Sequence, residues 1–337
     1  MSDKKILITG GSGFIGTNLV EYYLQHEWVV LNLDIAPPRN KTHLPYWKKV
    51  DILNKQPLLE YINEFKPHFV LHFAARTDLK EKKDIKGYAV NIDGVLNIIN
   101  SIKITKSVQR IMFASSQLVC QIGYQPLNDL DYCPTTLYGK SKVLGEKTVL
   151  DKMGSDTEWI IVRPTSIWGP WFDAPYKYFF LSIARNFYAH PKGITVLKQW
   201  GFVGNTVHQI NELLNMPYEK IDRKIYYLAD YEPLNLLYFA NYVRRFLGKK
   251  SVHTFPIEWL SWAAKVGDFS QKLGWNNPPL STYRLHNMIT NEIQKIEPLK
   301  LLVGPLPYTL DKGVELTLQW LNSQGLLPEV KPPSHAP

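Results

Sequence analysis

Three glycines near the start of the chain, Gly10, Gly13 and Gly16, constrain the fold more than any other feature. They follow the apolar run Ile6–Ile8, and apolar residues then recur at helical spacing from Ile15 to Leu24. A strand that turns through glycines into a helix brings backbone N–H groups and the positive end of the helix dipole to one point. This arrangement is typical of a pyrophosphate-binding turn.

The first half of the chain alternates short apolar runs with helix-like segments. The predicted strands lie at 28–33, 69–73, 111–114 and 159–162, and the predicted helices at 55–65, 88–104 and 136–152. Strands that alternate with helices indicate a parallel sheet covered on both faces. We therefore predict an α/β protein, a Rossmann-type doubly wound parallel sheet with a smaller, mixed C-terminal domain.

The domain boundaries follow from a change of pattern after Pro164, where aromatic residues and prolines become denser. Residues 1–170 are predicted to form a dinucleotide-binding domain, and residues 171–337 a substrate-binding domain. The segment from roughly 203 to 232 is expected to return to the first domain, because Ile225–Ala229 has the pattern of one more buried strand.

The acidic residue Asp34 closes the second predicted strand, 18 residues after Gly16. A carboxylate at this place accepts hydrogen bonds from ribose hydroxyls and repels a 2′-phosphate. The expected cofactor is therefore NAD rather than NADP. Arg39 leaves NADP open, since it lies close to Asp34 in the sequence and an arginine nearby accommodates a 2′-phosphate.

Tyr138 and Lys142 are four residues apart on a predicted helix, hence on the same face and one turn apart. A phenol ionises near pH ~10, and a neighbouring ammonium group stabilises the phenolate. Such a pair is suited to moving a proton to or from an alcohol or ketone while a hydride moves to or from nicotinamide. The spacing is common on helices by chance, and it gains weight because the glycine turn occurs in the same chain.

With these motifs, the chain resembles the extended short-chain dehydrogenase/reductase family, in particular its NAD-dependent nucleotide-sugar epimerases and dehydratases. The other resembling segments are Asp51-Ile52, His72-Phe73-Ala74-Ala75, Asn91-Ile92-Asp93-Gly94, Ser115-Ser116, Arg163-Pro164 and Gly169-Pro170. The resemblance covers most of the chain and is sharper before residue 170.

The resemblance implies roles for individual residues. Tyr138 is expected to be the acid/base, Lys142 to bind the nicotinamide ribose and lower the pKa of the tyrosine, and Ser116 to orient the reacting oxygen. The expected cofactor contacts are Gly10, Gly13, Phe14, Ile15, Gly16, Asp34, Asp51, Ile52, Ala74, Ala75, Asn91, Ser115 and Pro164. The candidate substrate contacts are Thr77, Thr165 and Arg284, of which Arg284 either clamps a diphosphate or is a surface arginine.

Two segments depart from the family pattern. Family dehydratases carry an Asp-Glu pair directly after the catalytic Ser or Thr, whereas this chain has Gln117-Leu118. Neither side chain transfers a proton effectively, so a 4,6-dehydratase is disfavoured. Where relatives have a basic and aromatic strand near the substrate phosphates, this chain has the segment Phe202–His208 without the usual basic residue.

Composition narrows the partners. The formal net charge is +9, but the basic residues are scattered, so small anionic substrates are expected rather than nucleic acid. Two cysteines, Cys120 and Cys133, are too few for a disulfide framework, which favours a cytoplasmic location. No apolar run reaches the ~18 residues of a membrane span and no signal peptide is evident, so no membrane partner is expected. The histidines lack metal-ligand spacing, and no metal is expected.

The leading prediction is an NAD-dependent enzyme that epimerises a ring carbon of a nucleotide-diphosphate sugar through Ser116, Tyr138 and Lys142. Three alternatives stay open: an NAD(P)H-dependent 4-keto-sugar reductase, a reductase of steroid or flavonoid-like ketones, and a non-catalytic dinucleotide sensor. The sensor is the weakest of them, because such relatives typically lose the Tyr/Lys pair. The resemblance also implies a homodimer, with helices near 92–104 and 137–152 packed across a two-fold axis.

Overall fold

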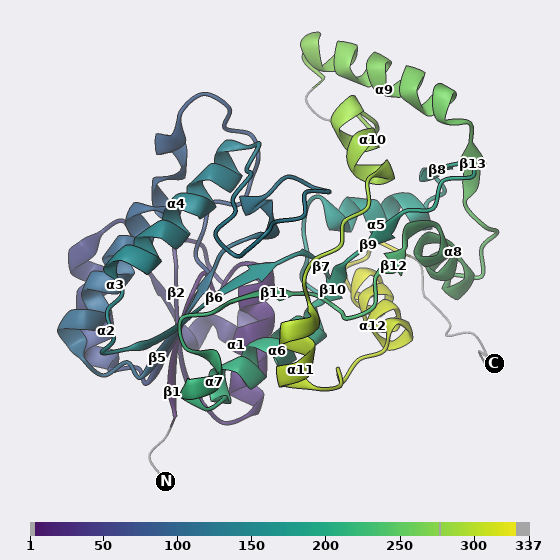
Figure 1. Ribbon diagram of the computed structural model, residues 1–337. Helices are drawn as coiled ribbons and strands as arrows, with labels where there is room; N and C mark the ends of the chain where they lie inside the picture. The colour runs from purple at the N-terminus through teal and green to yellow at the C-terminus, as the bar shows by residue number, and fades with distance from the viewer. Residues whose placement is uncertain (1–3, 276–277, 328–337) are drawn as a thin grey trace.

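A seven-stranded parallel sheet forms the centre of the computed structural model, which describes residues 4–275 and 278–327 (Figure 1). Its strand order is β11-β6-β5-β4-β1-β2-β3. The strands are β1 (Lys5–Thr9), β2 (Val29–Asp34), β3 (Trp47–Lys49), β4 (Phe69–His72), β5 (Arg110–Ala114), β6 (Glu158–Pro164) and β11 (Ile225–Leu228). The predicted doubly wound α/β fold is confirmed.

Helices cover both faces of this sheet. Helices α1 (Phe14–Gln25) and α6 (Val203–Asn215) lie on one face, while α2 (Lys55–Phe65), α3 (Asp93–Thr105) and α4 (Leu137–Lys152) lie on the other. In β1, Ile6 and Ile8 pack into the first layer and Leu7 into the second. A strand that is buried on both sides needs apolar residues at every position, which explains the continuous apolar runs of the sequence.

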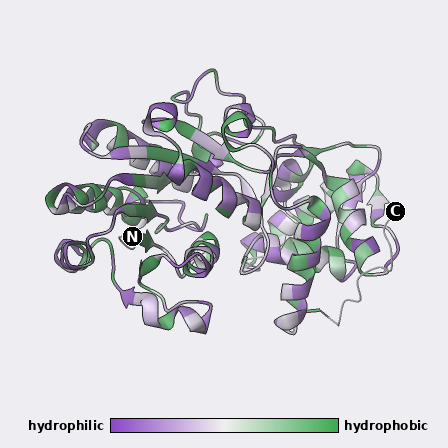
Figure 2. Cartoon of the chain, turned by 90° about the horizontal axis from the view of Figure 1, so that it is seen from below, coloured by the Kyte–Doolittle hydropathy of each residue, from purple (hydrophilic) through white to green (hydrophobic). Residues whose placement is uncertain are grey.

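The rest of the chain builds a smaller part around an aromatic core. Trp168 is fully buried there, and its ring centre lies 5.2 Å from that of Phe202 and 5.4 Å from those of Phe180 and Phe239. Three helices and three strand pairs contribute: α5 (Tyr176–Ala184), α8 (Leu236–Phe246), α12 (Leu310–Ser323), β7 (Ser166–Trp168) with β10 (Trp200–Phe202), β9 (Leu197–Lys198) with β12 (Leu234–Asn235), and β8 (Ala189–Pro191) with β13 (His253–Phe255). Figure 2 shows hydrophobic and hydrophilic residues mixed along most helices, as expected for helices that turn one face inward.

Part of the second half lies against the central sheet. Helix α6 packs on α1, and β11 pairs parallel to β6. The short helix α7 (Tyr218–Ile221) lies between α6 and β11 in the chain. Helix α11 (Glu297–Val303) packs on α6 and β11 as well, which the sequence did not predict. The division of the whole chain into two domains stays a prediction.

One local prediction was wrong. The single helix expected at 88–104 is a 3₁₀ helix, Ile85–Asn91, followed by α3, so Asn91 ends the 3₁₀ helix. In the segment 202–208 only Phe202 belongs to a strand, because α6 begins at Val203.

Helices α9 (Ile257–Lys272) and α10 (Thr282–Ile289) had no counterpart among the predicted elements, and Figure 1 shows them as a projecting pair. Within the described residues, helices long and apolar enough to cross a membrane are absent.

Candidate active site

The glycine turn joins β1 to α1 in a confined space. Gly10 has φ of +74°, and a Cβ added to it would lie 2.5 Å from the backbone nitrogen of Ala74. A Cβ on Gly16 would overlap the carbonyl oxygen of Gly10. Gly13 offers no side-chain cap to α1, so the first N–H groups of this helix are left for another acceptor. The turn therefore fits the pyrophosphate of a dinucleotide.

Asp34 and Arg39 both lie beside this turn. The Asp34 carboxylate accepts hydrogen bonds from the backbone nitrogens of Ser12 and Ala36, each at 3.0 Å. Burial raises the pKa of Asp34, and these hydrogen bonds and the charge of Arg39 act in the opposite direction. The Arg39 guanidinium donates to the carbonyl oxygens of Ser12 and Trp171, at 3.2 and 2.8 Å. The acidic group that favours NAD and the arginine that left NADP open are thus neighbours.

The other expected cofactor contacts lie at the carboxyl ends of the strands, where ligands of such sheets bind. Phe14 and Ile15 follow β1, Asp51 and Ile52 follow β3, Ala74 and Ala75 follow β4, Ser115 follows β5, and Pro164 ends β6. Asn91, at the end of the 3₁₀ helix, connects the segment after β4 to helix α4. Its amide nitrogen donates to the Ser141 hydroxyl at 2.9 Å and to the Arg76 carbonyl at 3.0 Å.

Ser116 and Tyr138 are brought together after β5. The Ser116 hydroxyl accepts a hydrogen bond from the Leu118 nitrogen at 3.1 Å and forms a side-chain hydrogen bond with Tyr138. Helix α4 approaches this segment closely, because a Cβ on Gly139 would overlap the carbonyl oxygen of Leu118. The Thr136 hydroxyl caps the helix by accepting from the Gly139 nitrogen at 3.0 Å. Glycine at position 139 thus lets the tyrosine reach the serine.

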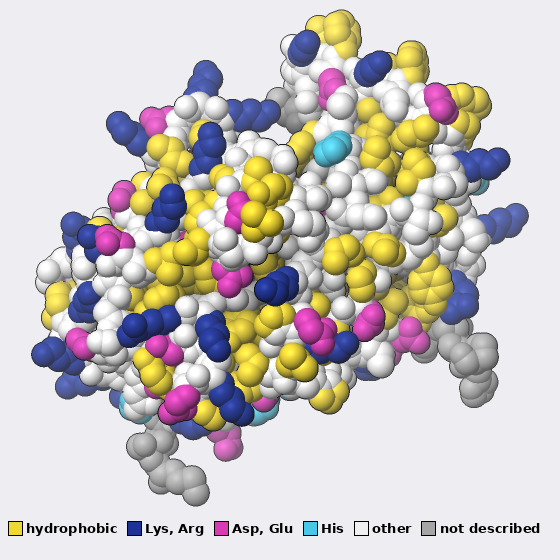
Figure 3. Space-filling model, in the orientation of Figure 1, with side chains coloured by type: hydrophobic (Ala, Val, Ile, Leu, Met, Phe, Trp, Pro, Cys, Tyr) yellow, Lys and Arg dark blue, Asp and Glu magenta, His cyan; other side chains and the backbone are white. Residues whose placement is uncertain are grey.

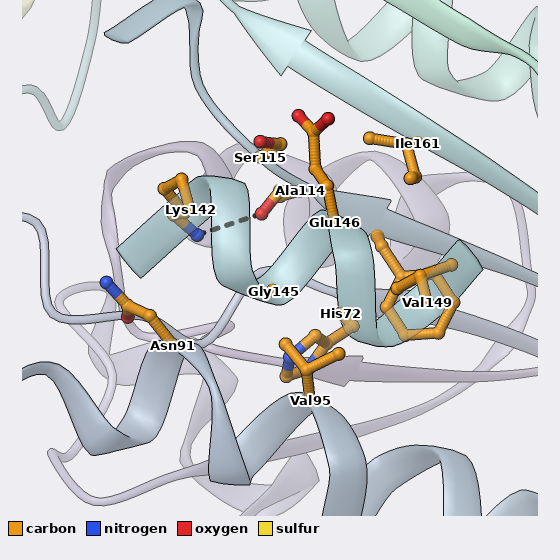
Figure 4. A pocket seen from close by; sticks show the side chains of 11 residues that line it. His72, Asn91, Val95, Ala114, Ser115, Lys142, Gly145, Glu146, Val149 and Ile161 are labelled. Carbon is orange, nitrogen blue, oxygen red and sulfur yellow. Dashed lines mark hydrogen bonds between the residues drawn. The ribbon is translucent and has the colours of Figure 1, made fainter. Parts of the chain in front are cut away.

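Burial sets the protonation of the Tyr/Lys pair. It raises the pKa of Tyr138 to about 12, although the hydrogen bond with Ser116 acts in the opposite direction. It lowers the pKa of Lys142 to about 8. The Lys142 amine donates to the Ala114 carbonyl at 2.9 Å (Figure 4). In this arrangement the shift of the Tyr138 pKa is opposite to the expected one, because burial, with Tyr88 acting in the same direction, outweighs the hydrogen bond with Ser116.

A small cavity lies beside Lys142 and reaches from β4 and β5 to α4; Figure 4 shows His72, Ser115 and Glu146 around it. Burial and the charge of Lys142 lower the pKa of His72 to about 3, so its ring is neutral, and its Nδ1 lies 2.8 Å from the Thr9 hydroxyl. Among the described residues the buried Ser115 hydroxyl has no hydrogen-bond partner. An unpaired polar group at this place fits a site that binds a polar ligand.

The candidate substrate residues are placed differently from one another. Thr77 is exposed after β4. The Thr165 hydroxyl is buried and donates to the Leu228 carbonyl at 3.1 Å. Arg284 lies on α10, where its guanidinium donates to the carbonyl oxygens of Pro278 at 2.6 Å and Pro279 at 3.2 Å. Their contact with a substrate stays a prediction.

The sequence did not predict a buried cluster of polar side chains that lies beside Tyr138. Ser166 is its centre, since Gln117 donates to the Ser166 hydroxyl at 3.3 Å and Tyr176 donates to it at 2.7 Å. Ser166 in turn donates to Glu292 at 3.3 Å, and Glu292 forms a buried ion pair with Lys198 at 3.3 Å. Tyr176 is close enough to Tyr138 for the two to interact electrostatically. Gln117 was the sequence signal, because it stands where dehydratases have an acidic residue.

The parallel sheet, the glycine turn and the contact between Ser116 and Tyr138 agree with the resemblance that the sequence indicated. Residues 6–229 match the model of the NAD dependent epimerase/dehydratase family. The chain belongs to this family. The expected resemblance is thereby confirmed, and NAD, the cofactor predicted from Asp34, is the cofactor of the family.

Two relatives show how the similarity is distributed. A 3-beta-hydroxysteroid dehydrogenase of Mycolicibacterium neoaurum is 27% identical over 265 residues, which are 73% of this chain and 71% of the relative. The N-acetyl-alpha-D-glucosaminyl-diphospho-ditrans,octacis-undecaprenol 4-epimerase of Escherichia coli O157:H7 is 26% identical over 330 residues. That match covers 95% of this chain and 96% of the relative.

Among solved structures, the UDP-glucose 4-epimerase of Thermus thermophilus in complex with NAD has the same fold. It superposes with a TM-score of 0.71 at 19% identity and covers 94% of this chain and 99% of its own. The likeness extends through the second half, where the sequence motifs were sparse. The epimerase/dehydratase fold therefore includes the smaller part of the molecule.

The desolvated Lys142 amine gives a prediction for stability. The unfolded chain keeps the Lys142 proton up to pH about 10.5, whereas the folded protein releases it near pH 8. Between these values the unfolded state binds more protons, so the free energy of unfolding rises with pH. Urea unfolding of the wild type and of Lys142→Met measures this effect. Between pH 7 and pH 10 the free energy of unfolding of the wild type should rise relative to that of the variant by up to about 3 kcal/mol.

The exposed neighbour Lys140 provides the control for this measurement. A Lys140→Met variant should differ from the wild type by the same amount at every pH, because its amine is already in water. If the difference in free energy of unfolding between the wild type and Lys142→Met is also independent of pH, the Lys142 amine is not desolvated in the folded protein.

Proposed function

We propose that the protein epimerises a ring carbon of a nucleotide-diphosphate sugar, with NAD as its cofactor. The observation that carries this proposal is the hydrogen bond between Ser116 and Tyr138, with Lys142 one helical turn away. It supports a proton transfer at the carboxyl end of β5, the same edge of the sheet as the glycine turn. A non-catalytic sensor would have no use for this arrangement.

The residues of this chain handle the proton of the reaction. Tyr138 takes the proton of the substrate hydroxyl while Ser116 holds the reacting oxygen by a hydrogen bond. NAD, when bound on the glycine turn, supplies the acceptor for the hydride. Both side chains are almost fully buried, with 8% and 7% exposure for Ser116 and Tyr138, so water is largely excluded from this step. Only the phenolate form of Tyr138 can accept this proton, and burial disfavours that form by raising the pKa to about 12. Lys142 is protonated at neutral pH, and its charge favours the phenolate.

The relatives point to two classes of sugar diphosphate as the substrate, which differ in the group that carries the diphosphate. The Thermus thermophilus neighbour is described as acting on a UDP-sugar, which supports a nucleotide carrier. The Escherichia coli relative that matches nearly the whole chain is described as acting on a sugar attached to undecaprenyl diphosphate. This full-length match makes a polyprenyl-diphosphate sugar the second candidate. In both classes a sugar is attached to a diphosphate, and the group at the other end of the diphosphate differs, a nucleoside in one and a polyprenol in the other.

The test is to incubate the purified protein, without added cofactor, with UDP-glucose, UDP-N-acetylglucosamine and undecaprenyl-diphosphate N-acetylglucosamine. We expect a 4-epimer of one of them in the product analysis. We also expect NAD in an acid extract of the protein, because an epimerase regenerates its cofactor in every cycle.

Three outcomes would contradict the proposal. A protein that is isolated empty and consumes added NADPH would be a keto-sugar reductase. Thermal stabilisation by apolar ketones but not by UDP or GDP would favour the steroid-like alternative, which the Mycolicibacterium neoaurum relative supports. Absence of any turnover with NAD bound would favour the sensor. The cytoplasmic location and the homodimer stay predictions.

A further inference from the structure

Helix α9 carries an apolar stripe on its exposed side. Its residues are Trp259, Trp262, Val266, Phe269 and Leu273, which follow one another at steps of three and four along the helix and just beyond its end. Each is between 48% and 74% exposed. Residues at this spacing share one face of a helix. A continuous row of large apolar side chains in water is unusual, since soluble surfaces carry such residues singly.

The opposite face of α9 is already used in packing. Leu260, Ala264 and Gly267 are buried there, and the helix packs against α10. The contact is close, because a Cβ on Gly267 would overlap the carbonyl oxygen of Leu280. The orientation of α9 is thus fixed by its small residues. The apolar stripe is therefore left facing outward, and it is not available to complete the core.

The position of α9 makes this stripe accessible to a large partner. Figure 1 shows α9 and α10 as a projection at the edge of the molecule, on the side away from the N-terminus. In Figure 3 hydrophobic side chains lie along the outer part of this projection. The surface is a ridge formed by one helix. A ridge suits a broad, deformable surface better than it suits a peptide, which binds in a groove.

The composition of the projection favours lipid. Three tryptophans belong to this region, since Trp275, 57% exposed, follows the two of the stripe. Indole rings are enriched at the boundary of membrane and water. Lys265 and Lys272 are exposed on α9, seven residues apart and beside the stripe, and residues 249–289 contain five basic and two acidic side chains. A helix with aromatic residues on one face and lysines beside them is typical of binding in the plane of an anionic bilayer.

We propose that α9 docks the protein on the surface of an anionic lipid bilayer, with the Trp259 face in the interfacial layer. The expectation from sequence that no membrane partner is involved rested on the length of apolar runs, which bears on helices that span a bilayer and not on a helix that lies in its surface. The helix would lie on the membrane and not cross it. The proposal is independent of the reaction, although a bilayer is where a polyprenyl-diphosphate sugar, the second substrate candidate, would be found.

The test is co-sedimentation of the full chain with vesicles of phosphatidylcholine alone and of phosphatidylcholine mixed with phosphatidylglycerol. We expect binding to the mixed vesicles that weakens with added salt. The variant Trp259→Ser/Trp262→Ser should bind at least about tenfold more weakly, because two indoles no longer enter the interface. Lys265→Gln/Lys272→Gln should lose most of the preference for the anionic vesicles.

The matched control is Leu127→Ser/Leu301→Ser, which removes two side chains that are 91% and 78% exposed elsewhere on the surface. It should bind vesicles as the wild type does. Equal loss in this control, or wild-type binding by the tryptophan variant, would overturn the proposal. The proposal would also be overturned if the wild type does not bind vesicles and sedimentation velocity shows that it is a dimer which the tryptophan substitutions dissociate. These readouts need no substrate, so they do not depend on the proposed reaction.

Discussion

Replacing Tyr138 by Phe should lower kcat about 10³-fold and leave the affinity for NAD unchanged. The substitution removes only the hydroxyl that forms a hydrogen bond with Ser116. General acid–base catalysis by one group contributes about 10²- to 10⁴-fold, and Tyr138 is the acid/base of the proposed reaction. Steady-state turnover and calorimetric titration with NAD measure the two quantities separately.

The matched control is Tyr226→Phe, which removes a phenol hydroxyl on β11 that lies 3.5 Å from the Lys220 carbonyl. It should keep its activity within about twofold. Turnover retained by Tyr138→Phe would show that another group moves the proton. Loss of NAD binding together with turnover would mean that the introduced phenyl ring disturbs the site, and Tyr138→Phe would then not report on proton transfer.

Replacing Glu146 by Gln should destabilise the protein by about 3 kcal/mol or more. Glu146 and Arg163 form an ion pair in which both side chains are 1% exposed. The guanidinium donates to the two carboxylate oxygens at 2.9 and 2.7 Å, and the Tyr132 hydroxyl donates to one of them at 2.9 Å. The neutral amide leaves the charge of Arg163 buried without its counter-charge. Urea unfolding of the two proteins at neutral pH measures the difference.

An exposed ion pair provides the comparison for this variant. Lys312 and Glu315 lie 3.0 Å apart on α12, with side chains 50% and 27% exposed. Glu315→Gln should cost about 0.5 kcal/mol or less, because water screens both charges. If Glu146→Gln is equally mild, the Arg163 charge is compensated by its other acceptors, such as the Asp129 carbonyl at 2.7 Å.

Both substitutions act on one side of α4. Tyr138, Lys142 and Glu146 are spaced at four residues and share a face of this helix. The first two belong to the candidate chemistry, and the third ties the helix to β6 through Arg163. The ion pair thus fixes the helix from which the tyrosine reaches Ser116. The polar residues of this face explain why α4 lacks a clear apolar stripe.

The sequence predicted those features that depend on neighbours along the chain. Most strands of the central sheet contain a continuous apolar run, such as Ile6–Ile8 in β1, and the glycine turn follows directly after β1. Tyr138 and Lys142 were recognised by their spacing on one helix. Asn91 was identified as a site residue, but its place at the end of a 3₁₀ helix depends on its bonds with Arg76 and Ser141.

Features that depend on distant segments were not predicted. Ser166, Lys198 and Glu292 meet beside the active site from three separate parts of the chain. The direction of the Tyr138 pKa shift depends on burial by the folded chain, and no spacing encodes that. The sequence did not predict helix α9, because large apolar residues lie on its exposed face. Apolar residues at helical spacing are usually interpreted as the buried face of a helix.

The path of the chain between the two parts of the molecule has a practical consequence for protein engineering. The chain leaves the central sheet after β6, returns through α6 and β11, leaves again, and comes back with α11. A fragment that stops near residue 170 would lack the edge strand and two of the helices that cover one face. To transplant the substrate-recognising part into a relative, a designer would have to exchange at least two separate stretches of sequence and keep the returning ones in place.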